Sequence, residues 1–342
     1  MTYVEAVELF IARTGHTRTG SAHTASAYRT DLRHFGTALH NARLRFDAVS
    51  RREAERYLAR LSAEVAPRSV RRRVSCVRSF YRFLRGIEAV SANPFDALDL
   101  PAFDRKSETH KVLDDDELAD VVELLGRDVQ HADRRLADAP RGRRMRAFAT
   151  LFSAARRRAA FNLMAFGGLR RGEVIGLDRD AIVSRPDGFA LSFVGKGGKS
   201  RTVPLVGFVY PAMFDWLTVR RHVPASSSAV FVTMTGRPLD PKQLERDCAR
   251  IGERACTRHR LTPHVLRRTF ATRSLRASGD IRAVQVLLGH ASIQTTEVYT
   301  HVDEEGLREL VEATALASTT GRAAGAREHA RGPLLRSVIT SV

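Results

Sequence analysis

The chain of 342 residues has few cysteines, and they form no recognisable pattern. Cys76, Cys248 and Cys256 make no CxxC pair. An odd, sparse count argues against a disulfide scaffold and is typical of a reducing cytoplasm. Cys248, Cys256 and His264 follow one another at eight-residue gaps, a spacing that matches no common zinc pattern. We therefore expect a cytoplasmic protein with no disulfide framework and no metal site.

Signals for membrane insertion and for secretion are also missing. The sequence contains no run of about 18 apolar residues, the length that predicts a membrane span. The first residues, MTYVEAVELF, carry acids and no basic segment, so we expect no secretory signal. Apolar residues still make up 43% of the chain, enough for the cores of two domains.

Acidic residues are too few to balance the basic ones. The chain has 56 Lys and Arg against 38 Asp and Glu, a formal net charge of +18. Such an excess attracts polyanions through counterion release, so nucleic acid is the first partner to consider. A ribosomal or membrane-surface protein is the alternative, and a GC-rich genome would also raise the use of Arg.

Residues 1–100 read as a helical domain. Apolar periodicity predicts helices over residues 2–13, 21–39 and 68–85. The last, RSVRRRVSCVRSFYRFLR, carries no acid, and we interpret its cations as a face that binds the DNA backbone rather than a solvated surface. The arginines of this face are Arg71, Arg72, Arg73, Arg78, Arg82 and Arg85.

The polar segment 101–111 is expected to be a linker, and residues 112–313 a second domain that begins with an acid-rich helix. Residues 126–146 are rich in Arg and are expected to be a mobile insertion, or a loop that orders on DNA. A long helix is predicted over 147–166 and a β-hairpin over 188–205. The tail 314–342 is expected to be disordered or to dock on a neighbouring protomer. The fold class is therefore mainly α with a small β-hairpin or sheet.

Two stretches near the C-terminal end carry groups suited to acid–base and nucleophilic chemistry. In LTPHVLRRTFAT, Thr262 and Pro263 start a helix, so His264 and Arg267 share one face of its first turns. A surface pair is the alternative interpretation. Leu266, Phe270 and Leu275 are expected to anchor the opposite side.

In LLGHASIQTTEVYTHV, His290 follows a helix that Asp280 caps and Gly289 ends, and Tyr299 lies nearby. A lone tyrosine is more often a core or interface residue. A phenol has a pKa of about 10, so it needs a base or nearby cations before it can attack.

Two further motifs supply cations. FGGLRRGEVIGL places Arg170 after a Gly-Gly turn, with Glu173 able to orient a guanidinium and Arg171 as a competing candidate. VGKGGKSR places Lys196 and Lys199 at a hairpin tip and is not a GxxxxGK[ST] loop, so it predicts no nucleotide triphosphate site. Cations, proton-transfer groups and a hydroxyl nucleophile are what phosphoryl transfer requires when no metal carries the charge.

This set of motifs resembles the tyrosine recombinase, or phage integrase, family, in particular its Xer-like members. That family shows a TGLR-type arginine box, a GKGxKxR hairpin, HxLRxTFAT and LGHxSIxTTxxYTHV, after a helical domain that ends near NP. The motifs occur here in that order over about residues 1–312. Gly167 stands where the family has Thr, and segment 126–146 is longer than the usual connection.

The resemblance implies a SAM-like core-binding domain, a mixed α/β catalytic domain and a role for each motif residue. Arg170 and Arg267 would clamp the scissile phosphate, and Lys196 would protonate the leaving 5′-hydroxyl.

The resemblance also assigns the acid–base groups and the nucleophile. His264 would transfer a proton, His290 would bind the phosphate and Tyr299 would form a 3′-phosphotyrosyl link. No cofactor, metal or ATP is implied.

The expected function is site-specific recombination of double-stranded DNA, in integration, transposition or chromosome or plasmid resolution. The resemblance implies that the protein acts as a homo-tetramer on DNA, or as a hetero-tetramer with a paralogue. No membrane partner is expected. A type IB topoisomerase and a catalytically inactive DNA-binding regulator are the alternatives.

Overall fold

The computed structural model describes residues 1–15, 22–102, 111–185, 188–194, 200–224, 227–288 and Leu335. The chain divides into two compact units, Met1–Glu108 and Thr109–Val342. Lys196, Lys199, Gly289, His290 and Tyr299 lie outside the described residues, as do most of the expected linker and tail.

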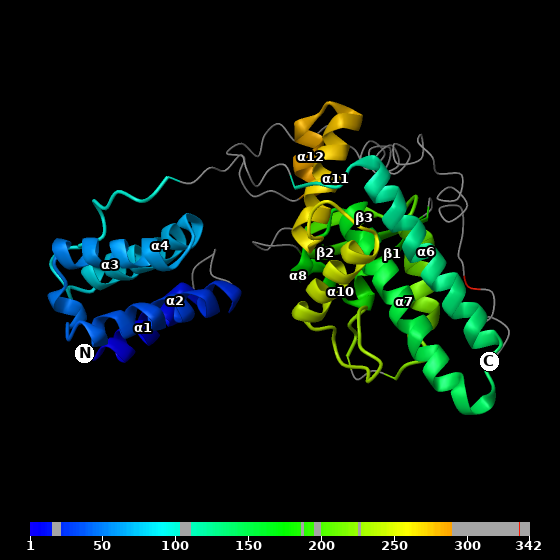
Figure 1. The fold of residues 1–342 in the computed structure, drawn as a ribbon, viewed down its shortest axis with the longest axis horizontal. Helices are drawn as coiled ribbons and strands as arrows, with labels where there is room; N and C mark the ends of the chain where they lie inside the picture. Colours follow the sequence, from blue (N-terminus) through cyan, green and yellow to red (C-terminus); the bar gives the residue numbers. More distant parts are fainter. Residues whose placement is uncertain are drawn as a thin grey trace. The chain divides into compact units, whose positions relative to one another are not determined.

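The N-terminal unit is entirely helical in its described part (Figure 1). Its helices are α1 (Tyr3–Gly15), α2 (Ala22–Asn41), α3 (Arg51–Glu64) and α4 (Pro67–Gly86), with a short 3-10 turn at Phe46–Ala48. The three helices predicted from periodicity correspond to α1, α2 and α4. Buried aromatic rings fill the centre, where Phe35 packs edge-on against Phe95 and Tyr81.

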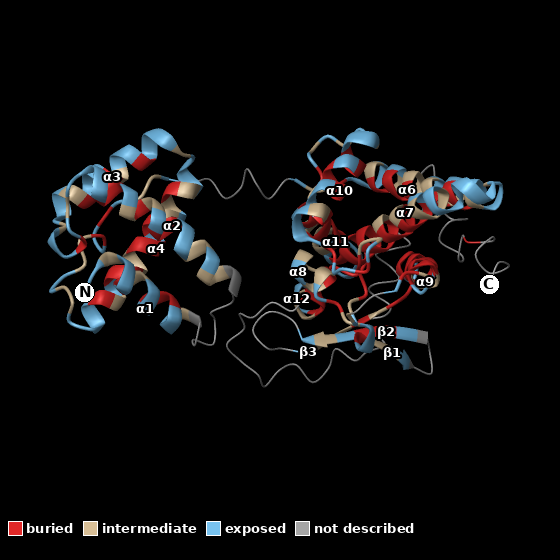
Figure 2. Cartoon of the chain, turned by 90° about the horizontal axis from the view of Figure 1, so that it is seen from below, coloured by how far each residue is buried: buried red, intermediate tan, exposed pale blue. Residues whose placement is uncertain are grey.

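The second unit places a small antiparallel sheet beside a larger group of helices (Figure 2). Its helices are α6 (Asp115–Ala137), α7 (Arg144–Ala165), α8 (Arg171–Ile175), α9 (Val209–Arg220), α10 (Pro241–Arg254), α11 (Pro263–Ser278) and α12 (Ile281–Leu288). The sheet order is β1 (Ile182–Arg185), β2 (Gly188–Val194), β3 (Ser200–Pro204). The mainly helical fold class is confirmed.

The hairpin prediction is confirmed for β2 and β3, which pair Leu191 with Val203, both fully buried. Strand β1 was not predicted. It has only four residues, Ile182–Arg185, too few to give a clear alternation, and its pairing with β2 through Ile182 and Leu191 depends on tertiary context.

The expectation of a mobile insertion at 126–146 is wrong, since α6 runs on to Ala137 and α7 starts at Arg144. Only the 3-10 turn Arg141–Arg143 and its flanks separate the two helices. The apolar residues of this segment are sparse, but Val129, Ala132 and Leu136 continue the helical spacing of Leu125, which precedes the segment, and all four pack on the core. A narrow apolar stripe is enough to hold a helix against a larger partner.

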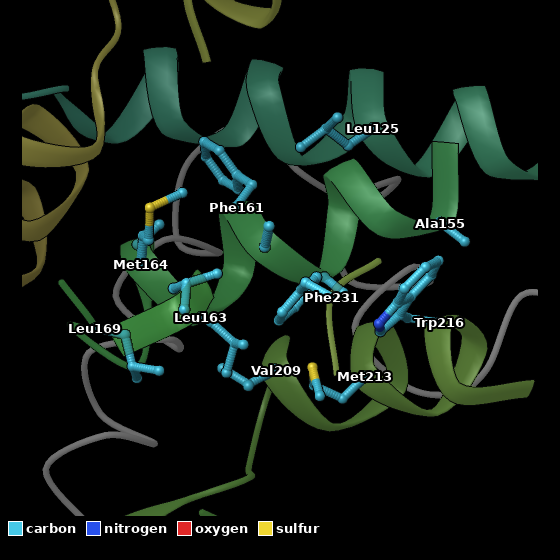
Figure 3. Close-up of a cluster of buried hydrophobic side chains, with 14 of the residues drawn as sticks. Leu125, Ala155, Phe161, Leu163, Met164, Leu169, Val209, Met213, Trp216 and Phe231 are labelled. Carbon is cyan, nitrogen blue, oxygen red and sulfur yellow. The ribbon is translucent and has the colours of Figure 1, made fainter. Parts of the chain in front are cut away.

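Helix α7 is the centre of the second unit. From Leu151 to Ala165 most of its side chains are buried, which is the pattern of a helix enclosed on all sides. Figure 3 shows Phe161, Leu163 and Met164 of α7 between Leu125 of α6 and Val209, Met213 and Trp216 of α9. This packing fixes the direction in which α7 delivers the Gly-Gly turn and Arg170.

Two buried arginines of α7 each form an ion pair with one buried aspartate. Arg158 Nη1 donates to Asp215 Oδ2 of α9 at 2.5 Å, and Arg156 Nη2 donates to Asp247 Oδ2 of α10 at 3.3 Å. Burial is the main cause that lowers the pKa of each arginine below its ordinary value. Each pair therefore joins α7 to a neighbouring helix with its charges matched.

Among the described residues, no helix combines the length and the apolar character that are needed to cross a membrane.

Candidate active site

The Gly167–Gly168 turn, which leads to Arg170, packs against α11. At the end of α7 the amide of Leu169 donates to the carbonyl of Leu163 at 3.1 Å. Gly168 has φ +62°, and a Cβ there would lie 2.4 Å from the ring of Phe270 on α11. Only glycine meets both conditions without a shift. At Gly167, where the resembling family has Thr, a Cβ would lie 2.8 Å from the Leu163 carbonyl oxygen, so this backbone is fitted to glycine.

Glu173 is the centre of a buried cluster of charged groups. The backbone amide of Arg170 donates to its Oε2 at 2.7 Å, and Arg170 Nη1 donates to its Oε1 at 2.7 Å. Arg201 Nη2 of β3 donates to Oε2 at 2.8 Å, and Arg267 Nη1 of α11 lies 3.9 Å from the same oxygen. One carboxylate thus contacts three guanidinium groups, from the residue that precedes α8, from β3 and from α11.

The cluster has more positive than negative charge. Burial opposes ionisation of Glu173, but Arg201 and the contacts from Arg170 outweigh it and hold the pKa of this carboxyl below its usual range. Burial first, and then the charges of Arg170 and Arg201, lower the pKa of Arg267 to about 9. Glu173 and Arg267 are therefore both ionised at neutral pH, and a buried excess of guanidinium groups over carboxylate favours an anion beside it.

The cluster has an open side at Arg170. The Arg170 side chain is 29% exposed, whereas that of Glu173 is 7% exposed. Arg267 is buried and donates to the Gly168 carbonyl and to the Leu288 carbonyl, the latter at 2.5 Å. These bonds fix the plane of its guanidinium group, which still has further N–H donors. The arrangement can bind an oxyanion that approaches past Arg170.

Arg201 belongs to the cluster, although the sequence motifs did not predict a role for it. Its Nη1 donates to the Leu287 carbonyl at 2.6 Å, and its guanidinium lies 5.1 Å from the centre of the Phe193 ring. Burial is the main cause that lowers its pKa to about 10. The sequence could have indicated its burial, because Arg201 lies two residues before the apolar Val203 in β3 and therefore faces the same, inward side of the strand.

The predicted start of the His264 helix is confirmed. Thr262 caps α11 by accepting a hydrogen bond from the amide of Val265 at 3.2 Å, and Pro263 is its first residue. His264 is exposed in the first turn, and Arg267, three residues on, is buried. Leu266 and Phe270 are fully buried as expected.

The prediction for Leu275 is wrong, because this side chain is 39% exposed. It lies near the end of α11, where no element covers that side of the helix in the described part of the chain.

Helix α12 ends at the charged cluster around Glu173, two residues before His290 in the sequence. Asp280 caps it, accepting hydrogen bonds from the amides of Arg282 and Ala283 at 2.7 and 3.2 Å. Its last two residues, Leu287 and Leu288, supply the carbonyls that Arg201 and Arg267 bind. Lys196, His290 and Tyr299 lie outside the described residues, so their roles remain predictions.

The arginine face of α4 is less free than expected. Arg72 forms an ion pair with the buried Asp31 of α2. Arg78 donates to the carbonyls of Phe95 and Leu98 at 2.8 and 3.3 Å. Arg71 likewise donates to Pro101, at 3.1 Å. These three side chains hold α4 to its surroundings, and DNA binding by this face stays a prediction.

The remaining arginines of that face differ from one another. Arg73 is half-buried, whereas Arg82 and Arg85 are exposed. In the described residues, no group of three or more His, Cys, Asp or Glu side chains is arranged to hold a metal ion.

Comparisons with known proteins agree with this geometry. The model of the Phage integrase family matches residues 143–305, and that of the Phage integrase N-terminal SAM-like domain matches residues 7–86. Tyrosine recombinase XerC of Chlorobaculum parvum is 33% identical over 319 residues, which cover 89% of this chain and 92% of the relative. Tyrosine recombinase XerD of Shewanella oneidensis is 30% identical over 301 residues, 85% and 89% of the two chains.

Solved structures share the fold. XerH site-specific recombinase in a post-cleavage complex with palindromic difH substrate has a TM-score of 0.63 at 19% identity, covering 85% of this chain and 80% of that one. A lambda integrase dimer bound to a COC′ core site has a TM-score of 0.59 at 16% identity, covering 85% and 96%. The alternatives of a topoisomerase and an inactive regulator find no support in these similarities. The chain belongs to the tyrosine recombinase, or phage integrase, family of enzymes that cleave and rejoin DNA at specific sites.

Proposed function

We propose that this recombinase binds the scissile phosphate of double-stranded DNA at the cluster around Glu173. The observation that carries the proposal is the buried excess of guanidinium groups over carboxylate, with its open side at Arg170. A phosphodiester supplies the missing negative charge, and Arg170 and Arg267 donate to its non-bridging oxygens. Because the donors are already held in place, little reorganisation is needed as charge develops in the transition state.

The nucleophile in this proposal is Tyr299. Its phenolic oxygen forms a bond to phosphorus, the bond to the 5′-oxygen breaks, and a 3′-phosphotyrosyl link results. His264 accepts the phenolic proton and Lys196 gives a proton to the 5′-oxygen, while His290 donates a hydrogen bond to the phosphate. His264 is exposed beside the buried Arg267 on α11, which supports this assignment. The link keeps the energy of the phosphodiester, so the free 5′-hydroxyl of another strand can reverse the step.

The test is to capture the covalent link. The protein is incubated with fragmented genomic DNA of its host, denatured, and the DNA that remains attached is sequenced. We expect adducts at a small number of sites, with the peptide link mapped to Tyr299. Tyr299→Phe should bind the same DNA and give no adduct. An adduct that persists in this variant would remove Tyr299 from the mechanism.

We also propose that four protomers act together on two DNA sites in the cytoplasm. The DNA complexes of similar fold support DNA as the partner, and exchange of strands between two sites requires a cleaving protomer at each of the four strands. The sites recovered from the adducts are placed on one plasmid, in pairs or singly. Recombination should need two sites, and cross-linked protein on DNA should reach the mass of a tetramer. Relaxation of a plasmid with a single site, without recombination between two, would instead indicate a topoisomerase.

A further inference from the structure

The turn between α6 and α7 presents a cluster of arginines, which we name the arginine tip (residues 134–146). Its arginines are all exposed, and the only acid between them is Asp138. They are Arg134, Arg135, Arg141, Arg143, Arg144 and Arg146. Figure 1 shows α6 and α7 side by side, with their connection at the end away from α8, α11 and α12.

The arginines of the tip differ from other exposed arginines of the same unit. Arg254 forms an ion pair with Asp128 at 2.5 Å, and Arg127 with Glu123 at 3.6 Å. Arg258 pairs with Asp114 and Glu117. Within the described ranges, no arginine of the tip takes part in an ion pair. The cluster is therefore a local excess of charge and not a network that stabilises the helices.

The position of the cluster on α7 also lacks a structural reason. Arg143, Arg144 and Arg146 lie at the start of α7, whose first turn contains no acid and has no side-chain cap. The start of a helix is the positive end of its dipole, where cations are unfavourable. Arg134 and Arg135 are better placed, because they lie in the last turn of α6. The cations at the start of α7 thus oppose the helix that carries them.

The tip is far from the candidate active site. Helix α7 has 22 residues, and at a rise of 1.5 Å per residue the tip lies about 33 Å from the end that leads to Arg170. That length is close to one turn of B-DNA, about 34 Å. A phosphate held at Arg170 therefore cannot be the one that the tip contacts.

We propose that the arginine tip binds the sugar–phosphate backbone of duplex DNA at a place separate from the scissile phosphate. The proposal rests on the proposed function for the identity of the polyanion. An acidic protein is less suitable, because the cores of protein interfaces are rich in aromatic residues and the tip has none. Arginine forms paired hydrogen bonds to phosphate oxygens, and backbone contacts of this kind carry affinity without sequence preference.

The test compares two full-length triple variants with equal loss of charge. One is Arg143→Gln, Arg144→Gln and Arg146→Gln in the tip. The control is Arg127→Gln, Arg254→Gln and Arg258→Gln, which removes arginines that are paired in the structure. Affinity for a non-specific duplex is measured over a range of salt concentrations. The slope of log K against log salt is negative, and each lost phosphate contact lowers its magnitude by about 0.9.

We expect the magnitude of the slope to fall by about 2 to 3 in the tip variant, with at least about a tenfold loss of affinity at moderate salt. The control slope should change by less than about 1. Adduct formation at low salt and saturating DNA should be the same for the tip variant and the wild type. Equal slopes for the two variants, or a tip variant that matches the wild type, would overturn the proposal and leave an acidic protein as the partner. If the wild type itself makes no adduct, the proposed function fails, while the binding comparison stands on its own.

Discussion

Two buried groups of charges in the second unit are built differently. Along α7, Arg158 and Arg156 each face one aspartate, so positive and negative charges are equal. Around Glu173, three guanidinium groups share one carboxylate. Matched pairs join helices and need no further ligand, whereas a buried excess of one sign is stable only if another ion compensates for it or if water reaches it. The difference separates charges that hold the fold from charges that we propose bind the substrate.

The largest effect on folding should come from breaking a matched pair. Asp215→Ala leaves Arg158 buried without its partner, and we expect the free energy of unfolding to fall by about 3–5 kcal/mol. Denaturant unfolding measures it. The double variant Arg158→Met, Asp215→Leu should be much closer to wild type, and Asp128→Ala, which breaks an exposed pair, should cost at most about 1 kcal/mol. A small loss for Asp215→Ala alone would contradict the distinction.

Removing a member of the unmatched cluster should act on the reaction. In Arg267→Ala we expect adduct formation at saturating DNA to slow by about 10²–10³-fold, as for other lost oxyanion donors. The loss of stability should be smaller than for Asp215→Ala, because one of several repelling charges is removed. Arg254→Ala is the matched control outside the cluster. A variant that unfolds as readily as Asp215→Ala and cleaves normally once folded would place Arg267 with the matched pairs.

Arg201 should show an intermediate effect, since it acts on the site through Glu173 and α12. In Arg201→Ala we expect the rate of adduct formation to fall by about 10–100-fold, the range for groups that orient others. The affinity for DNA should change little. Arg201→Lys should recover part of the rate, because a cation again faces Glu173. A loss of affinity with an unchanged rate at saturation would instead make Arg201 a direct DNA contact.

The smallest effect is expected at the turn that joins the two groups of charges. Gly168→Ala forces a side chain into the left-handed region and against Phe270, and we expect a loss of about 1–3 kcal/mol of stability. Gly86→Ala is the control, because a Cβ there meets nothing within 4 Å and its φ is not positive. Thermal unfolding compares the two. Equal shifts would mean that the Gly168 backbone is not constrained.

The helices and the hairpin could be predicted because their signals are local. The spacing of Val70, Val74 and Val77 predicts α4, and Thr262 and Pro263 predict the start of α11. The partners of charged side chains could not be predicted, since Glu173 and Arg201 are 28 residues apart and Arg156 and Asp247 are 91 apart. A period tells which face of an element is inward, but not which distant residue it will meet.

The same reason explains the error in segment 126–146. The small number of apolar residues there indicates a loop, but their spacing fits a helix that packs on a larger core. Likewise the sequence does not show which α4 arginines bind groups of the protein, because Asp31 of α2 and the carbonyls of Phe95 and Leu98 are distant in sequence. In both cases the answer depends on the neighbour that the helix packs against.

Helix α12 is attached to the rest of the unit in an unusual way. Its apolar residues form a small cluster of their own with Val206 and Phe270, separate from the main core. At its end, Leu287 and Leu288 are held by the guanidinium groups of Arg201 and Arg267. These two arginines belong to the proposed phosphate pocket, and α12 leads directly to the motif that contains Tyr299. In the proposed function, filling the pocket and positioning Tyr299 are thus linked equilibria, and whatever displaces α12 should alter DNA affinity by the same factor as DNA alters the placement of α12.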